Sequence, residues 1–311
     1  MAESLRIGDV GADVAILQRR LNARGASLNV DHVFGSATDA AVRDFQRSLG
    51  LVVDGIVGPR TQGLLLGVVP PAYALTQADV EAAAATLGCD VAAIQAVVSV
   101  ESPKGGFLPD GRVVILFERH VFYRQLQAAG IDPRPLEVVR PDICNPKPGG
   151  YIGGPGEYAR LAAAKQFNEV CALESASWGR FQIMGNHYET VGYATVQDFV
   201  ADMATGEAAQ LRAFVKLTMD DADLHEALQH RDWLTFARIY NGPNYAINHY
   251  DARLAAAFKL HGGVAAPITP EAVEAKAAVT SAPEETDPTT PSTDAGTSRR
   301  GKRNAKAEAT A

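Results

Sequence analysis

Hydrophobic residues recur at helical spacing in two short segments near the start of the chain. Segments 14–21 (VAILQRRL) and 42–49 (VRDFQRSL) place their apolar side chains at the same positions of one helical face. A related turn-rich segment follows each of them, VDHVFGSAT at 30–38 and VDGIVGPRT at 53–61. The pattern predicts an internal repeat that folds as a compact three-helix unit over residues 1–67.

A second hydrophobic pattern runs from residue 91 to residue 100 (VAAIQAVVSV) without a charge and ends on Glu101. This run is too short to cross a membrane and fits a helix buried in a protein core. Residues 78–263 are otherwise mainly helical in pattern, except for the β-branched segment 112–117 (RVVILF), which predicts a strand. The second domain is therefore expected to present one carboxylate at the end of a buried helix.

The ends of these two units carry loop signals. Residues 68–77 (VVPPAYALTQ) contain two prolines and predict a linker, with Thr76 as the N-cap of the next helix. Residues 264–311 are rich in Pro, Thr, Ala and Glu and have no periodic apolar face, so we expect a disordered tail. Its basic end, SRRGKRNAK, fits a solubilising tail or contact with an anionic surface.

Composition narrows the function classes. The chain has 311 residues, 47% hydrophobic content and a net charge of −7, without a basic patch typical of nucleic-acid binding. Its three cysteines show no metal-type spacing, so we expect free thiols and neither metal nor cofactor. The first residues, MAESLRIGDV, lack a basic and apolar leader, and no segment predicts stable membrane insertion. These features favour synthesis in a reducing cytoplasm.

Glu101 is the leading candidate for chemistry. Partial burial and the negative end of the helix dipole are both expected to raise the pKa of its carboxyl group. A carboxylic acid that stays protonated near neutral pH can protonate a leaving-group oxygen, as a glycosidase requires. The alternative interpretation is a solvated glutamate at an ordinary helix end.

Two later segments are rich in side chains that suit a polysaccharide. In ALESASWGRFQIMG (172–185), small residues would let a sugar approach the backbone, an indole offers a flat face, and an amide can bond an N-acetyl group. FARIYNGPNYAINHY (236–250) adds a tyrosine and an asparagine beside a turn glycine. The candidate substrate-binding residues are Ser177, Trp178, Gln182, Met184, Tyr240 and Asn241.

The phrases LRIGDVGADVAILQRRL, VDHVFGSATDAAVRDFQ and GLVVDGIVGPRTQGLL resemble the peptidoglycan-binding domain 1 family. Two departures are His32, where the first loop usually has glycine, and Gln62, where an aromatic residue is common. The alternative is a three-helix linker without affinity for the wall. The resemblance implies that wall binding involves Asp31, Phe34, Gln46, Asp54, Gly58 and Thr61.

The phrases VESPKGGFLPDGRVVILFERHVF and SASWGRFQIMGNHY resemble the phage and bacterial N-acetylmuramidase family of the lysozyme-like superfamily. The implied fold is mainly α: the three-helix domain, then an α+β lysozyme-like domain over 78–263 with a small β-hairpin. The resemblance makes Glu101 the catalytic acid. Glu118 is the first candidate for a second catalytic group, with a salt bridge to Arg119 or another nearby arginine as the equal alternative. Weaker candidates are Glu174 and Asp110; His120 and His187 are expected to be structural or exposed.

This combination predicts a modular endolysin of a phage that infects Gram-negative hosts. Such an enzyme would hydrolyse the β-1,4 bond between N-acetylmuramic acid and N-acetylglucosamine, with peptidoglycan strands as its partner. We expect a monomer that waits in the host cytoplasm and reaches periplasmic peptidoglycan with the help of a holin. The alternatives are a lytic transglycosylase with 1,6-anhydro products, a bacterial autolysin or toxin, and a non-catalytic wall-binding or virion protein.

Overall fold

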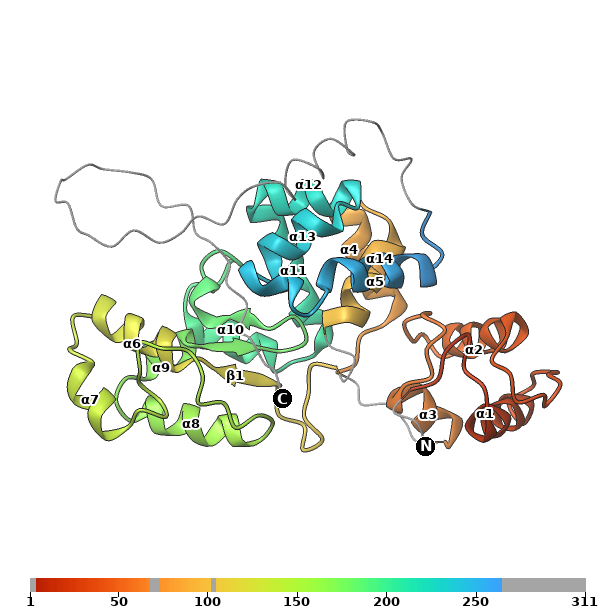
Figure 1. Cartoon of the computed structure of the whole chain (residues 1–311), viewed down its shortest axis with the longest axis horizontal. Helices are drawn as coiled ribbons and strands as arrows, with labels where there is room; N and C mark the ends of the chain where they lie inside the picture. The colour runs from red at the N-terminus through yellow and green to blue at the C-terminus, as the bar shows by residue number, and fades with distance from the viewer. Residues whose placement is uncertain (1–3, 68–72, 102–104, 265–311) are drawn as a thin grey trace.

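The computed structural model describes residues 4–67, 73–101 and 105–264, which form a small N-terminal group of helices and a larger, mainly helical group with one small sheet (Figure 1). The smaller group consists of α1 (Ala12–Asn22), α2 (Ser36–Ser48) and α3 (Pro59–Leu65). The larger group contains the helices α4 (Gln77–Leu87), α5 (Val91–Glu101), α6 (Arg119–Ala128), α7 (Arg134–Val139), α8 (Gly156–Lys165), α9 (Glu169–Glu174), α10 (Val196–Met203), α11 (Glu207–Asp220), α12 (Ala222–His230), α13 (Trp233–Tyr240) and α14 (Tyr250–Leu260), the 3-10 turns η1 (Gly185–His187) and η2 (Pro243–Ala246), and the strands β1 (Ile115–Phe117), β2 (Ala176–Trp178) and β3 (Ile183–Met184).

The predicted repeat is confirmed as a duplicated hydrogen-bond arrangement around two buried glutamines. In the first copy the Gln18 amide donates to Asp31 Oδ1 at 2.7 Å and to Thr38 Oγ1 at 3.1 Å. The second copy repeats both bonds, because the Gln46 amide donates to Asp54 Oδ1 at 2.6 Å and to Thr61 Oγ1 at 3.4 Å. Each glutamine thereby fastens its own helix to the loop that follows it.

One position of the repeat carries a conformational penalty in the first copy. His32 has φ 66°, and its counterpart Gly55 has φ 71°. A left-handed backbone costs a non-glycine residue roughly 1–2 kcal/mol. Replacing that residue with glycine removes this strain, but the greater backbone entropy of glycine in the unfolded chain offsets part of the benefit. We therefore expect His32→Gly to stabilise the chain by up to about 1 kcal/mol in urea unfolding.

The reciprocal change at Gly55 is the control for this prediction. A Cβ at Gly55 would lie 2.8 Å from Arg43 Nη2, in addition to its positive φ. Gly55→Ala is therefore expected to destabilise the chain, and unfolding curves that shifted in the same direction for both variants would contradict the backbone explanation.

The predicted core helix is confirmed as α5, whose residues 93–98 are buried and which packs against α4 and α14. Thr76 is the N-cap of α4, as the sequence predicts, and forms a capping box with Asp79. A long apolar helix can be buried on most sides only when neighbours cover it, which explains the absence of a polar face in its sequence. The buried helix ends on Glu101.

The strands form one antiparallel sheet in the order β1-β2-β3. Leu116 lies opposite Ser177, which in turn lies opposite Met184, so these three side chains share one face. The expected hairpin corresponds to β2 and β3, and β1 adds a third strand. The predicted strand at 112–117 is shorter than expected, since before Ile115 only an isolated bridge from Val113 to Phe107 continues the pairing.

The N-terminal helices contact the larger group close to α5. Gln95 of α5 donates to the carbonyl of Val53 at 3.2 Å, and Arg43 of α2 donates to the carbonyl of Leu260 at 3.1 Å. Both acceptors are backbone groups, so these contacts depend on the path of the chain more than on side-chain identity. The N-terminal unit therefore rests against the helix that carries Glu101.

In the described residues, no single helix is long and apolar enough to span a membrane. Helices α4 and α5 reach that length and composition only as a pair bent by 116°. Cys89, Cys144 and Cys171 are free, as expected. Residues 68–72 of the linker and residues 265–311 of the tail lie outside the described residues.

Candidate active site

Glu101 is the last residue of α5, and both of its carboxylate oxygens are buried. The buried apolar run before it fixes the helix axis, and the helix brings the carboxylate to the point where regular structure ends. The structure therefore places Glu101 where the sequence predicts an acid, at the shielded end of a core helix.

Two arginines contact the carbonyls at this helix end. Arg180 Nη2 donates to Val98 O, and Arg253 Nη2 donates to Val100 O, both at 3.3 Å. The last carbonyls of a helix lack partners within it, and cations near them are favourable. The expectation from the sequence considered burial and the helix dipole, whereas the structure adds two positive charges that offset the dipole.

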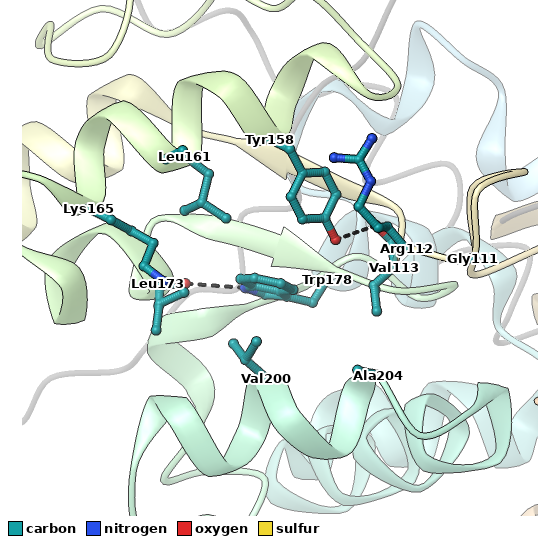
Figure 2. Close-up of a pocket in the computed structure, with 11 residues that line it drawn as sticks. Gly111, Arg112, Val113, Tyr158, Leu161, Lys165, Leu173, Trp178, Val200 and Ala204 are labelled. Carbon is teal, nitrogen blue, oxygen red and sulfur yellow. Dashed lines mark hydrogen bonds between the residues drawn. The ribbon is translucent and has the colours of Figure 1, made fainter.

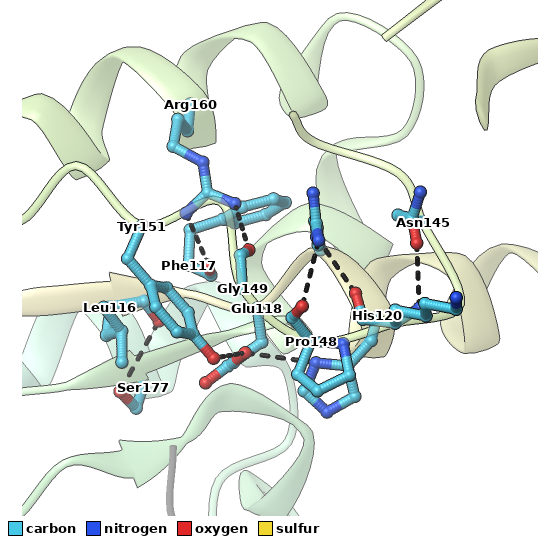
Figure 3. A network of polar contacts seen from close by, with 12 residues as sticks. Leu116, Phe117, Glu118, His120, Asn145, Pro148, Gly149, Tyr151, Arg160 and Ser177 are labelled. Carbon is cyan, nitrogen blue, oxygen red and sulfur yellow. Dashed lines mark hydrogen bonds and ion pairs between the residues drawn. The ribbon is translucent and has the colours of Figure 1, made fainter. Parts of the chain in front are cut away.

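Glu118 follows β1 directly and lies on the sheet face shared by Leu116 and Ser177 (Figure 3). Its side chain is 1% exposed; Tyr151 donates a hydrogen bond to Oε2 at 2.8 Å, and His120 Nδ1 lies 3.1 Å from the same oxygen. The other oxygen, Oε1, is buried with no hydrogen-bond partner among the described residues. Oε1 is therefore the oxygen of Glu118 whose hydrogen-bonding capacity the described residues leave unused.

The alternative of a salt bridge between Glu118 and Arg119 is not observed. Arg119 instead donates to the carbonyls of Lys147, Pro141 and Pro148, each at 2.9 Å. These bonds hold the proline- and glycine-rich loop that carries Tyr151. Arg119 thus supports the partner of Glu118 and does not neutralise Glu118 itself.

The β2–β3 turn, residues 179–182, is where the two predicted substrate-binding segments, 172–185 and 236–250, contact each other. Ser177 donates to Gln182 Oε1 at 2.8 Å, and the Gln182 amide donates to Gly179 O at 2.7 Å. Tyr240, whose hydroxyl donates to Phe181 O at 2.8 Å, reaches the same turn from α13. Because Gln182 braces the turn from within, sugar binding by Gln182 stays a prediction and would require an exchange of these bonds.

Trp178 lies on the opposite face of the sheet from Ser177 and is only 3% exposed. Its indole nitrogen donates to Leu173 O at 3.2 Å, and its ring borders a pocket of about 480 Å³ between α8 and α10 (Figure 2). The sequence predicts an open stacking surface for a sugar. The structure instead buries this ring on the sheet face opposite Ser177, where it packs beside Leu173 and the residues between α8 and α10.

Met184 and Asn241 occupy different environments. Met184 is buried opposite Ser177 in the sheet. Asn241 caps the end of α13 at 7% exposure, and neither its Oδ1 nor its Nδ2 has a hydrogen-bond partner among the described residues. A buried amide without partners is costly, so Asn241 is a suitable group for a ligand or a water molecule.

The weaker carboxylate candidates lie in unlike surroundings. Asp110 accepts hydrogen bonds from Arg112, and these lower the pKa of its exposed carboxyl group. Burial, together with the neighbouring Glu189 carboxylate, raises the pKa of Glu174 at the end of α9. His120 contacts Glu118, so it belongs to the network of that residue.

Most of the predicted wall-binding residues form the frame of the N-terminal domain. Asp31, Gln46, Asp54 and Thr61 belong to the duplicated hydrogen bonds, and Phe34 is fully buried. Gly58 is the N-cap of α3. Burial of Asp54 raises its pKa, whereas the Gln18 bond lowers that of the exposed Asp31. Direct contact of these residues with the wall stays a prediction.

The sequence interpretation did not identify several residues that shape the site: Tyr151, Glu157, Arg160, Arg180 and Glu207. Arg180 stands inside the quoted phrase SASWGRFQIMG, where its position before the hairpin strand was a usable signal. Tyr151 and Glu207 have partners far away in the sequence, whereas Glu157 and Arg160 pair with each other three positions apart. A buried carboxyl group at the end of a core helix, within a mainly helical domain that has one small antiparallel sheet, is the arrangement expected of a lysozyme-like glycosidase.

Comparison with known families agrees with this class. The N-acetylmuramidase family model matches residues 90–262, and the peptidoglycan binding domain model matches residues 10–65. Because the first match covers more than half of the chain, the chain belongs to the N-acetylmuramidase family. The crystal structure of a Burkholderia AP3 phage endolysin is similar, at 50% identity and a TM-score of 0.80, covering 83% of this chain and 99% of that chain.

Curated relatives share a shorter stretch. A zinc D-Ala-D-Ala carboxypeptidase of Streptomyces albus G is 46% identical over 61 residues, 19% of this chain and 24% of the relative. A spore cortex-lytic enzyme of Bacillus cereus is 45% identical over 60 residues, 19% of this chain and 23% of the relative. The chain spans about a quarter of the length of these curated relatives.

Proposed function

We propose that the protein is a phage endolysin that hydrolyses the β-1,4 bond between N-acetylmuramic acid and N-acetylglucosamine in peptidoglycan. The observation that carries the proposal is the position of Glu101, a shielded carboxyl group at the end of a buried helix. Membership of the N-acetylmuramidase family and similarity to a phage endolysin support it.

In the proposed reaction, Glu101 donates its proton to the glycosidic oxygen as the bond breaks. Positive charge then develops on the muramic acid ring in an oxocarbenium-like transition state. The rigid end of α5 holds the donor in place, so little reorganisation accompanies proton transfer. The carboxylate that remains can later accept a proton from the attacking water.

Glu118 is proposed as the second group, which positions that water or stabilises the developing charge. Tyr151 and His120 both contact Oε2, which leaves Oε1 for the water. The Tyr151 hydroxyl, which donates to Oε2 at 2.8 Å, holds the carboxylate in the orientation that this role requires.

Product analysis tests the reaction type. Purified peptidoglycan is digested with the full-length chain and the fragments are identified by mass spectrometry. Reducing muramic acid ends are expected for hydrolysis, whereas 1,6-anhydro ends would assign the protein to the lytic transglycosylases. A zymogram without clearing would instead indicate a wall-binding protein that lacks catalysis.

The N-terminal domain is proposed to hold the enzyme on the wall. We expect deletion of residues 1–67 to reduce binding to sacculi and to slow lysis severalfold without removing catalysis. Binding is measured by sedimentation with both forms carrying Glu101→Gln, so that the sacculi stay intact. Equal sedimentation of the two forms would contradict this role.

The cellular context follows from the same proposal. We propose that the protein acts as a monomer, accumulates in the host cytoplasm and reaches the wall through a holin lesion. An autolysin or toxin with the same chemistry would be encoded beside bacterial rather than phage lysis genes, so the gene neighbourhood distinguishes these origins.

A further inference from the structure

Glu207, the first residue of α11, lies at a junction of segments that surround Glu101. Its carboxylate is 5% exposed; Oε1 accepts the amide of Gly106 at 2.7 Å, and Oε2 accepts the amide of Leu75 at 3.0 Å. Gly106 follows Glu101 by five positions, and Leu75 immediately precedes the N-cap of α4. One carboxylate therefore holds the chain beyond Glu101 and the start of the larger domain.

The same carboxylate pairs with Arg180, whose Nη1 lies 3.2 and 3.1 Å from its two oxygens. The other end of this guanidinium donates to Val98 O in the last turn of α5, three residues before Glu101. Arg180 thus connects Val98, which precedes Glu101, to Glu207, which binds Gly106 after Glu101.

Gln210 completes the arrangement from the next turn of α11. Its Oε1 accepts the backbone amide of Arg180 at 2.7 Å, and its amide donates to Met203 O at 3.0 Å. A Cβ at Gly106 would overlap this oxygen and lie 3.0 Å from the backbone nitrogen of Arg180, so only glycine fits at position 106. Backbone and side chains are therefore in close contact around Gly106.

We propose that Glu207 and Arg180 are positioning residues that fix the Glu101 carboxyl group by holding the chain on both of its sides. The inference rests on the proposed function, since it assigns these residues to the same reaction. Neither residue is taken to contact the substrate. Their effect passes through Val98 in the last turn of α5 and through Gly106.

The charge of the pair suits this role. Burial opposes ionisation of Glu207, but the Arg180 guanidinium and the amides of Leu75 and Gly106 lower the pKa of its carboxyl group. A buried ion pair is a weak source of net folding free energy, yet its bonds are directional. The Arg180 guanidinium bonds the Glu207 carboxylate with one nitrogen and the Val98 carbonyl with the other. These directional bonds fix the end of α5, the start of α11 and the turn that carries Arg180 relative to one another.

The test compares Glu207→Gln, Arg180→Gln and the double variant in the full-length chain, with labelled sacculi as substrate. A displaced acid lowers the rate of the chemical step and leaves substrate binding intact, and a shift of about 1 Å can cost about 10²-fold. We expect kcat to fall about 10- to 100-fold at unchanged KM, and the double variant to match the single variants. Hydrogen exchange at the Gly106 and Leu75 amides should accelerate in Glu207→Gln.

Two further variants keep the inference separable from a loss of stability. Leu224→Ala removes buried volume in α12, away from these bonds, and each rate is divided by the folded fraction from near-UV circular dichroism. Gly106→Ala displaces the loop while the ion pair stays, and it should lower kcat even if Glu207→Gln does not fold.

Wild-type kcat in the folded fraction of these variants, or a loss no larger than in Leu224→Ala, would overturn the inference. If wild type is inactive on sacculi or Glu101→Gln is active, the proposed function fails instead.

Discussion

Replacing Glu101 with Gln is expected to lower the rate of peptidoglycan hydrolysis by about 10²–10⁴-fold, the usual contribution of a general acid. The amide has nearly the shape of the carboxyl group but has no proton to give to the glycosidic oxygen. Because both oxygens of Glu101 are buried, bulk water cannot readily replace it as the donor. Turbidity loss of chloroform-treated Gram-negative cells and release of reducing ends from sacculi measure the effect.

The matched control is Glu81→Gln, the same chemical change on an exposed position of α4. It should lyse cells at the wild-type rate. Near-UV circular dichroism and thermal unfolding of Glu101→Gln should remain close to wild type, which separates catalysis from folding. A folded Glu101→Gln protein that still clears cells would refute the assignment of the acid.

Glu118→Gln distinguishes the second group from the first. If Glu118 positions water, its amide variant should lose activity while Glu101 remains competent to protonate the leaving group. Comparison of Glu101→Gln with Glu118→Gln shows whether the two carboxyl groups take part in the same reaction.

Local patterns explain what the sequence predicts well. The uncharged run before Glu101 reveals α5, because a helix without a polar face must be covered on most sides. The repeat in the N-terminal domain is equally visible, since its glutamine, aspartate and threonine recur at fixed spacing and make the same bonds in both copies. The first signal lies within one helix, and the second joins residues at most 20 positions apart.

The contacts around the site could not be predicted in that way. Tyr151 reaches Glu118 across 33 positions, and Glu207 reaches Gly106 across 101 positions, without a local period to mark either pair. Trp178 shows a different limit. A strand of three residues is too short for alternation to indicate which face is buried, so its indole was expected on the substrate side and lies in the interior.

Glu157→Gln is expected to destabilise the chain by about 3–5 kcal/mol, because it leaves the buried guanidinium of Arg160 without a counter-charge. Glu157 is fully buried, and its Oε2 lies 2.7 Å from Arg160 Nη1. The same carboxylate accepts hydrogen bonds from the backbone amides of Phe117 at 3.1 Å and Ile152 at 2.7 Å. Phe117 is the neighbour of Glu118 in the sequence, and Ile152 is the neighbour of Tyr151. Urea unfolding measures the free-energy loss. Glu169→Gln, at the exposed Lys165 pair, should change it by less than about 1 kcal/mol.

The pH dependence of unfolding gives a second, independent measure of Glu157. Burial opposes its ionisation, but the amides of Gly153 and Ile152 and the Arg160 charge lower the pKa of this carboxyl group below its ordinary value. A lowered folded-state pKa contributes stability above the unfolded-state pKa of about 4.3, and this is lost as pH falls through the folded-state value. Wild type should therefore lose stability more steeply with acid than Glu157→Gln. Parallel curves would mean that the carboxylate is not ionised in the folded protein, and the Arg160 pair would then not hold the loop beside Glu118.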